Sequence, residues 1–268
     1  MRTYRPITLL TDFGQDDPFV GIIKGVIWGI LPQAPIVDLC HNLPSYDIAE
    51  AAFLIHLSYS FFPPQSVHLV VVDPGVGSKR RPLLVTTESH YFIAPDNGVL
   101  SYIFEKGGLR RVFEIKASHY FLSPPSSTFH ARDVFAPVAA YLCKGIEVEA
   151  FGSEIDDFVR ISLPWPRLIG KGVLAGEVLH TDRFGNLITN ICQSDLAQLT
   201  SQREGIEPIL KLGSLEIRGI RSFYGEGKKG RLEAVIGSFG YLEVFAYQGN
   251  AGRISGKKRG DEVIVILP

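Results

Sequence analysis

Hydrophobic residues in the first half of the chain follow two alternating patterns. Short continuous apolar runs, such as ITLLT (7–11) and SVHLVVVD (66–73), predict buried strands. Between them, apolar residues recur at steps of three and four over 19–32 and 46–63, which predicts helices, the second capped by Ser45 or Asp47. The same patterns predict strands at 35–40, 82–87 and 90–95 and helices at 96–106 and 130–145, the last broken or kinked near Pro137. Strands that alternate with helices predict an α/β fold with a mainly parallel sheet covered on both faces.

The pattern changes in the second half of the chain. The segment SLPWPRLIGKG (162–172) is rich in Pro and Gly and predicts a linker. Short apolar runs separated by turn residues follow it, and helix signals are scarce, which is typical of a small β-barrel or sandwich. We therefore predict two domains, an N-terminal α/β domain (1–166) and a C-terminal domain of short strands (167–268).

Composition narrows the class of protein further. The chain has 268 residues and a formal net charge of -1, so no overall field favours nucleic acid or an acidic membrane surface. No apolar run reaches transmembrane length, and the N-terminal run is too short for a signal peptide. The three cysteines lie far apart, which suits a reducing compartment. These features predict a cytoplasmic enzyme or binding protein that acts on neither nucleic acid nor membranes.

Two loops that follow predicted strands carry acidic residues. TDFGQDDP (11–18) holds Asp12, Asp16 and Asp17, which can cap the following helix, bind the diol of a ribose, or hold Mg²⁺. DPGVGSKRR (73–81) lacks the spacing of a phosphate-binding loop. It is either a turn with a solvated basic face or a loop whose Asp73 and one arginine form a charged pair in a cleft. Since Asp12 and Asp73 both follow strands, we expect them at the same edge of the sheet.

Three further segments offer polar groups suited to catalysis or binding. His130 in TFHARD (128–133) is either structural or a proton-transfer group, because histidine titrates near neutral pH. HTDRFGNLITNI (180–191) is most simply a hairpin with Gly185-Asn186 at its turn, yet its Asp182, Phe184 and Asn186 also suit an amine and a purine ring. SFGYLEVFAYQGNA (238–251) predicts a strand pair. No His or Cys spacing in the chain predicts a metal site.

Seven segments together resemble one family. The chain resembles the S-adenosyl-L-methionine hydroxide adenosyltransferases, which are adenosine-forming hydrolases similar to bacterial fluorinase and chlorinase. The segments that carry the resemblance occur in the family's order: LLTDFGQDDPFVGIIKGV, HNLPSYDIAEAAFLI, VVVDPGVGSKRRPLLV, APDNGVLS, TFHARDVFAP, DRFGNLITN and SFGYLEV.

The resemblance implies a fold, a reaction and an assembly. The fold is an N-terminal α/β domain followed by a small C-terminal β-barrel. S-adenosyl-L-methionine is the substrate, no cofactor is needed, and water attacks ribose C5′ in line to give adenosine and L-methionine. The assembly is a homotrimer with sites at subunit interfaces, each between the N-terminal domain of one subunit and the C-terminal domain of its neighbour.

The resemblance also implies roles for individual residues. The catalytic set is Asp73, Arg80 and His130, in which the arginine stabilises developing hydroxide and the other two orient the water and accept its proton. Which of those two takes the proton stays open. The substrate-binding positions are Asp12 for the ribose diol, with Asp17 in the same loop, Tyr46 near the ribose, Phe129 and Ala131 around the nucleophile, Asp182 near the methionine amine, Phe184 and Asn186 at adenine, and Ser238 at the methionine carboxylate.

Two departures from the halogenases matter for the choice of nucleophile. Halogenases carry a serine that donates to halide where this chain has Ala131, which argues against halide use. They carry an arginine where this chain has Phe239, so the partner of the methionine carboxylate stays open. The alternatives to hydrolysis are a halide-using 5′-halo-adenosine synthase and a non-catalytic protein that binds an adenosyl ligand.

Overall fold

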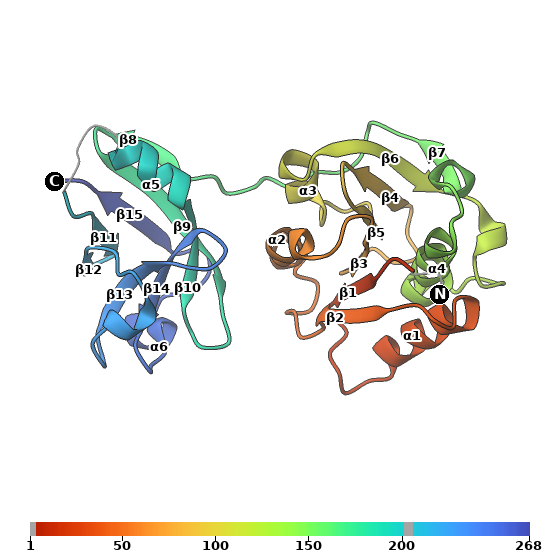
Figure 1. The fold of residues 1–268 in the computed structure, drawn as a ribbon, viewed down its shortest axis with the longest axis horizontal. Coiled ribbons are helices and arrows are strands. Elements are labelled where there is room, and N and C mark those ends of the chain that lie inside the picture. Colours follow the sequence, from red (N-terminus) through yellow and green to blue (C-terminus); the bar gives the residue numbers. More distant parts are fainter. Residues whose placement is uncertain (1–3, 201–205) are drawn as a thin grey trace. The chain divides into compact units, whose positions relative to one another are not determined.

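In a computed structural model of the protein, which describes residues 4–200 and 206–268, the chain divides into two units (Figure 1). The units are Met1–Ser162 and Leu163–Pro268. The domains expected from the sequence, 1–166 and 167–268, stay a prediction. No helix among the described residues is both long enough and apolar enough to cross a bilayer.

A seven-stranded sheet organises the described part of the first unit. Its strand order is β2-β1-β3-β5-β4-β6-β7, and the first four of these strands run parallel while β4, β6 and β7 are antiparallel. The predicted α/β fold class is confirmed. The strands are β1 (Ile7–Thr11), β2 (Ile36–Cys40), β3 (Val67–Val71), β4 (Pro82–Thr87), β5 (Tyr91–Pro95), β6 (Leu109–Ile115) and β7 (Gly152–Glu154).

Helices cover both faces of this sheet, as the sequence predicts. The fully buried Leu9 and Leu10 of β1 belong to different cores, because successive side chains of a strand point to opposite faces. One core includes α1 (Phe19–Ile30) and α4 (Ala136–Lys144), and the other includes α2 (Ile48–Ser58) and α3 (Ser101–Lys106). Each fully buried aliphatic side chain contributes about 1.5–3 kcal/mol of hydrophobic stabilisation.

The described residues of the second unit form an eight-stranded antiparallel sheet that is nearly closed into a barrel. The order is β12-β11-β15-β9-β10-β14-β13, with β8 paired to β9. Its elements are β8 (Arg167–Gly170), β9 (Val173–Thr181), β10 (Leu187–Cys192), α5 (Gln193–Thr200), β11 (Ile209–Leu212), β12 (Leu215–Arg218), β13 (Leu232–Ile236), β14 (Tyr241–Ala246), α6 (Ala251–Ser255) and β15 (Glu262–Ile266).

Two predictions for this unit were wrong in detail. The segment 162–172 is only partly a linker, because Arg167–Gly170 pair with β9 despite the nearby Pro and Gly residues. The segment 238–251 is one strand, β14, followed by the start of α6, and its hairpin partner is the preceding strand β13. In both places, pairing with a neighbouring strand decided the structure, which local composition cannot report.

Candidate active site

The loop between β3 and β4 folds back so that Arg80 meets Asp73. Two turns shape it, with Val76 N–H donating to Asp73 O (3.2 Å) and Ser78 N–H donating to Gly75 O (3.1 Å). Arg80 Nε donates to Asp73 Oδ1 at 2.9 Å, and Arg80 Nη2 donates to Asp73 Oδ2. The side chains of Asp73 and Arg80 are only 6% and 8% exposed. Of the two interpretations of this loop, the charged pair is therefore confirmed, and its arginine is Arg80.

His130 joins the pair from a distant part of the chain. Arg80 Nη2 lies 2.8 Å from His130 Nδ1. His130 immediately precedes a π-helical turn, Ala131–Phe135, which leads into α4, and such turns are frequent at functional sites. Arg80 also lies over the ring of Phe135, with 5.2 Å between the guanidinium carbon and the ring centre. The structure thus brings the three predicted catalytic residues together.

The contact with Arg80 determines how the His130 ring is protonated. A guanidinium only donates hydrogen bonds, so His130 Nδ1 must accept, and a neutral ring then carries its proton on Nε2. Burial and the Arg80 charge both lower the pKa of His130, while Asp73 and Asp133 oppose that shift. His130 is therefore neutral at pH 7. Arg80 Nη1 is buried without a hydrogen-bond partner among the described residues, so the guanidinium keeps donors to spare.

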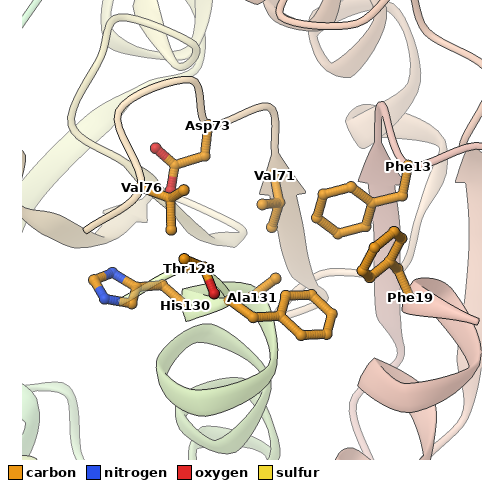
Figure 2. A pocket seen from close by; sticks show the side chains of 9 residues that line it. Phe13, Phe19, Val71, Asp73, Val76, Thr128, His130 and Ala131 are labelled. Atoms are coloured by element: carbon orange, nitrogen blue, oxygen red, sulfur yellow. The ribbon is translucent and has the colours of Figure 1, made fainter. Parts of the chain in front are cut away.

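An apolar pocket of about 150 Å³ adjoins these groups. Figure 2 shows Asp73 and His130 on one side of the pocket and Phe13 and Phe19 on the other. Phe129 packs edge-on against both of those phenylalanine rings, with ring centres 5.9 and 5.3 Å away. The remaining residues that line the pocket are Val71, Val76, Thr128 and Ala131.

Five pocket residues were not singled out from the sequence: Phe13, Phe19, Val71, Val76 and Thr128. Phe13 directly follows Asp12, and Val76 lies inside the turn after Asp73, so both stand beside predicted site residues. The sequence signal that could have identified Phe13 and Val76 as pocket residues is an apolar residue in a loop that follows a buried strand. Val76 and Ala131 carry no side-chain donor, so their side chains offer an anion no hydrogen bond.

Asp12 emerges at the same sheet edge as Asp73. Strands β1 and β3 are parallel, with Thr11 opposite Val71, so the residues that follow leave the sheet together. Asp12 Oδ2 accepts a hydrogen bond from Tyr46 N–H at 2.8 Å, and Tyr46 adopts a positive φ of 68° with its residue 71% exposed. Asp12 thereby connects two loops, and the two bonded residues lie 34 positions apart in the sequence.

The capping interpretation of the acidic loop was wrong. Pro18 occupies the N-cap of α1, no described side chain caps that helix, and its first turn carries no acidic residue. Asp16 and Asp17 are exposed. By contrast, α2 is capped as predicted, since Asp47 accepts from Glu50 N–H at 3.0 Å. The aspartates before α1 thus have no explanation as helix caps.

The predicted substrate residues of the second unit lie in two turns. Asp182 organises the β9–β10 turn: its Oδ1 accepts from Phe184 N–H (2.9 Å) and Asn186 N–H (2.8 Å), and its Oδ2 accepts from Asn186 Nδ2 (2.9 Å). The hairpin prediction is confirmed, with Gly185 at φ 86°. Phe184 is 75% exposed. Ser238 is exposed in the β13–β14 turn.

Among residues 4–200 and 206–268, no group of three or more His, Cys, Asp or Glu side chains is arranged to hold a metal ion. Asp12, Asp16 and Asp17 of the acidic loop are among these described residues, and they form no such group.

Comparison with known proteins decides the family. The N-terminal domain model of the SAM hydroxide adenosyltransferases matches residues 7–152, and the C-terminal domain model matches residues 176–264. The chain belongs to the SAM hydroxide adenosyltransferase family. The resemblance expected from the seven sequence segments is confirmed.

Curated relatives of this family member carry a specific name. A protein from Methanocaldococcus jannaschii named (R)-S-adenosyl-L-methionine hydrolase is 35% identical, covering 97% of this chain and 95% of its own. A Thermus thermophilus protein of the same name is 35% identical, covering 96% and 97%. A fluorinase from Actinoplanes is 27% identical over 88% of this chain and 89% of its own. A solved structure of an uncharacterised Thermotoga maritima protein, 34% identical, superposes with a TM-score of 0.91, covering 97% of this chain and 99% of its own.

Proposed function

We propose that this member of the SAM hydroxide adenosyltransferase family hydrolyses S-adenosyl-L-methionine to adenosine and L-methionine. The observation that carries the proposal is the guanidinium of Arg80, which contacts both Asp73 and His130 beside the apolar pocket. Family membership and the hydrolase relatives support the same reaction. Their name specifies the (R) form, so we propose the (R) epimer at sulfur as the preferred substrate.

In this reaction, water oxygen bonds to ribose C5′ as the bond between C5′ and the sulfonium breaks. The electron pair of the broken bond moves to sulfur and leaves neutral methionine thioether, and water loses one proton. The leaving group is good, so the difficulty lies in orienting and activating a weak nucleophile. Alignment of water and sulfonium in a dry pocket supplies up to about 7–11 kcal/mol of barrier reduction. The phenylalanines give the pocket an apolar wall, and Arg80 stabilises negative charge that grows on oxygen.

Asp73 is the group that we propose accepts the proton. Nδ1 of His130 accepts from Arg80 and Nε2 then carries a proton, so the neutral imidazole has no free lone pair. Each carboxylate oxygen of Asp73 has a second lone pair beyond the one used by Arg80. His130 then orients the water by donating from Nε2 and holds the guanidinium in place.

Substrate contacts follow from the same assignment. We propose that Asp12, with Asp17 in its loop, binds the ribose diol, and that Tyr46 lies near the ribose. Phe129 and Ala131 surround the nucleophile. In the second unit, Phe184 and Asn186 bind adenine, while Asp182 and Ser238 bind the methionine part. The exposure of Tyr46 and Phe184 supports these roles, because both side chains are available to cover a ligand.

We also propose the wider setting that the family resemblance implies. The protein forms a homotrimer in which the N-terminal unit of one subunit meets the C-terminal unit of a neighbour at each site. It needs no cofactor, since the sulfonium supplies the leaving group. It acts in the cytoplasm, and the free thiols of Cys40, Cys143 and Cys192 support a reducing compartment.

The test is identification of the product. Incubation with S-adenosyl-L-methionine in halide-free buffer, followed by chromatography, should yield adenosine and methionine in equal amounts. Added chloride or fluoride should leave that product unchanged, because the side chains of Val76 and Ala131 offer halide no donor. Formation of 5′-halo-adenosine would identify a halide-using synthase instead, and binding without any product would identify a non-catalytic binder.

Two substitutions separate chemistry from binding. Asp73→Asn keeps the shape of the side chain but removes the proton acceptor, so kcat should fall by about 10²–10⁴-fold with the substrate still bound. Asp12→Ala should mainly raise KM, because Asp12 is proposed to contact the ribose and not the water. Both parameters come from initial rates of adenosine release. Near-normal kcat in Asp73→Asn would contradict the proposed role.

A further inference from the structure

Two residues outside the pocket touch both ends of the loop that carries Asp73 and Arg80. Asp96 and Asn97 directly follow β5 in the segment APDNG, and they contact Val72 and Arg81. Val72 precedes Asp73 and Arg81 follows Arg80, so each contact lies one residue from a proposed catalytic group.

Asn97 completes hydrogen bonding where the sheet stops. The β3–β5 ladder runs as far as Leu69 opposite Ile93, and β5 ends at Pro95, which has no N–H to donate. The Asp96 N–H is directed to Arg81 O instead, at 2.8 Å. Val72 is fully buried, so its carbonyl needs a donor from the protein. Asn97 Nδ2 supplies it at 2.8 Å.

The orientation of the Asn97 amide is itself determined. Its Oδ1 accepts from Val99 N–H at 3.2 Å, so its nitrogen is the atom that faces Val72. A carboxylate in this place would keep the bond to Val99 but would set an acceptor against the Val72 carbonyl. Asn97 is thus required as an amide, and not only as a polar side chain.

Asp96 holds the other end of the loop through Arg81. Its Oδ2 accepts from Arg81 Nε at 2.9 Å and from Arg81 Nη2 at 2.7 Å, while its Oδ1 accepts from Val159 N–H at 2.8 Å. Asp96 is 6% exposed, and Arg81 also donates to Asp157 Oδ1 at 2.6 Å. Arg81 therefore faces away from Asp73 in a bonded network of its own, which leaves Arg80 as the arginine of the pair.

We infer that Asp96 and Asn97 are positioning residues for the proposed hydrolysis, which set the separation of Asp73 and Arg80 by anchoring Val72 and Arg81. The inference rests on the proposed function. Between the two anchors the loop contains Gly75 and Gly77, whose backbone freedom would otherwise allow many arrangements. A misplacement of about 1 Å in a reacting group can cost about 10²-fold in rate, so anchoring of this kind acts on kcat more than on substrate binding.

Asn97→Asp is the decisive variant. We expect kcat for adenosine release to fall about 10- to 100-fold, with KM and the calorimetric Kd for S-adenosyl-L-methionine within about threefold of wild type. Arg81→Lys, which loses the paired contacts to Asp96, should show the same division between kcat and KM. It also provides the test if Asn97→Asp does not fold, as judged by circular dichroism.

Thr87→Val is the matched control. Thr87 is buried at the opposite end of the β4–β5 hairpin, where its hydroxyl bonds to His90 N (3.0 Å) and His90 O (3.1 Å). It should lower the unfolding temperature with kcat unchanged. Wild-type kcat in folded Asn97→Asp and Arg81→Lys, or an equal loss of kcat in Thr87→Val, would overturn the inference. An inactive wild-type protein would instead refute the proposed function.

Discussion

At the scale of single residues, Arg80 donates hydrogen bonds both to a charged carboxylate, Asp73, and to a neutral imidazole, His130. Asp73 is stabilised as a carboxylate by two guanidinium donors, whereas His130 is kept neutral because its Nδ1 accepts from the same cation. One positive charge thus contacts both neighbours and favours the neutral ring of His130. The arrangement explains why an arginine stands at this position, since a lysine has no planar fork with which to meet both groups.

The neutral state of His130 predicts a pH profile. Burial and Arg80 lower the pKa of His130 from its ordinary 6.5, so the ring stays neutral at pH 7 and gains a proton only as pH falls below 6.5. Protonated His130 can no longer accept from Arg80. We expect kcat/KM to be level near pH 7 and to fall on the acid side, starting below pH 6.5. Adenosine release measured across buffers from pH 4 to 8 gives the profile.

His130→Gln provides the control for this assignment. Its amide oxygen can still accept from Arg80, but it does not titrate. The variant should be slower than wild type by about 10-fold or more, and it should lack the acid limb that His130 gives the wild-type protein. An unchanged acid limb in His130→Gln would assign the titration to another group.

At the scale of elements, two loops pack together to form the site. The β3–β4 loop carries Asp73 and Arg80, and the segment before the π-helical turn carries Thr128 and His130. They meet at Gly77, which has φ 76°, and a Cβ there would lie 2.1 Å from Ser127 O. Asp133 holds the second segment by accepting from Ser126 N–H at 2.7 Å. Gly77 is thus a point of close backbone approach that any side chain would disturb.

Gly77→Ala should therefore damage both stability and activity. The left-handed conformation costs about 1–2 kcal/mol for a residue with a Cβ, and the clash with Ser127 adds to it by moving one loop. We expect a lower unfolding temperature and at least about a tenfold loss of kcat. Gly145→Ala is the control, because Gly145 also has positive φ (100°) but a Cβ there meets nothing within 4 Å. Gly145→Ala should lose stability alone; equal activity losses in both variants would contradict the loop-packing argument.

At the scale of the whole molecule, the proposed substrate residues divide between two compact units. Asp12, Asp73, Arg80 and His130 belong to the first, and Asp182, Phe184, Asn186 and Ser238 belong to the second. The proposed trimer would let each subunit lend its second unit to a neighbour. In such an assembly, one chain can supply a functional first unit and another chain a functional second unit.

Mixing of inactive subunits tests that proposal. Asp73→Asn and Phe184→Ala chains, each impaired alone, should regain about a quarter of wild-type activity when co-expressed in equal amounts, since random assembly pairs intact units at one site in four. Adenosine release at low substrate is the readout, and light scattering gives the mass. Activity of the mixture that is only the average of the separate variants, or a monomeric mass, would contradict shared sites.

Local sequence patterns determined much of this protein before any tertiary contact was considered. Apolar periodicity placed β1, β3 and the helices, Asp47 was among the expected caps of α2, and Gly185-Asn186 marked the β9–β10 turn. These features depend on residues close in the chain, whose spacing reports which face is buried. The resemblance, and not the spacing, picked Arg80 over Arg81 and linked His130 to Asp73.

Tertiary structure alone decided the rest. Asp12 is bonded to the backbone of Tyr46, 34 residues away, instead of capping α1, and Arg80 reaches His130 across 50 residues of chain. Tertiary structure likewise decided that the Asn97 amide donates to the Val72 carbonyl. Such contacts depend on where parallel strands end and which loops meet at that edge. Because a side chain's partners there come from distant segments, its local sequence carries no record of them.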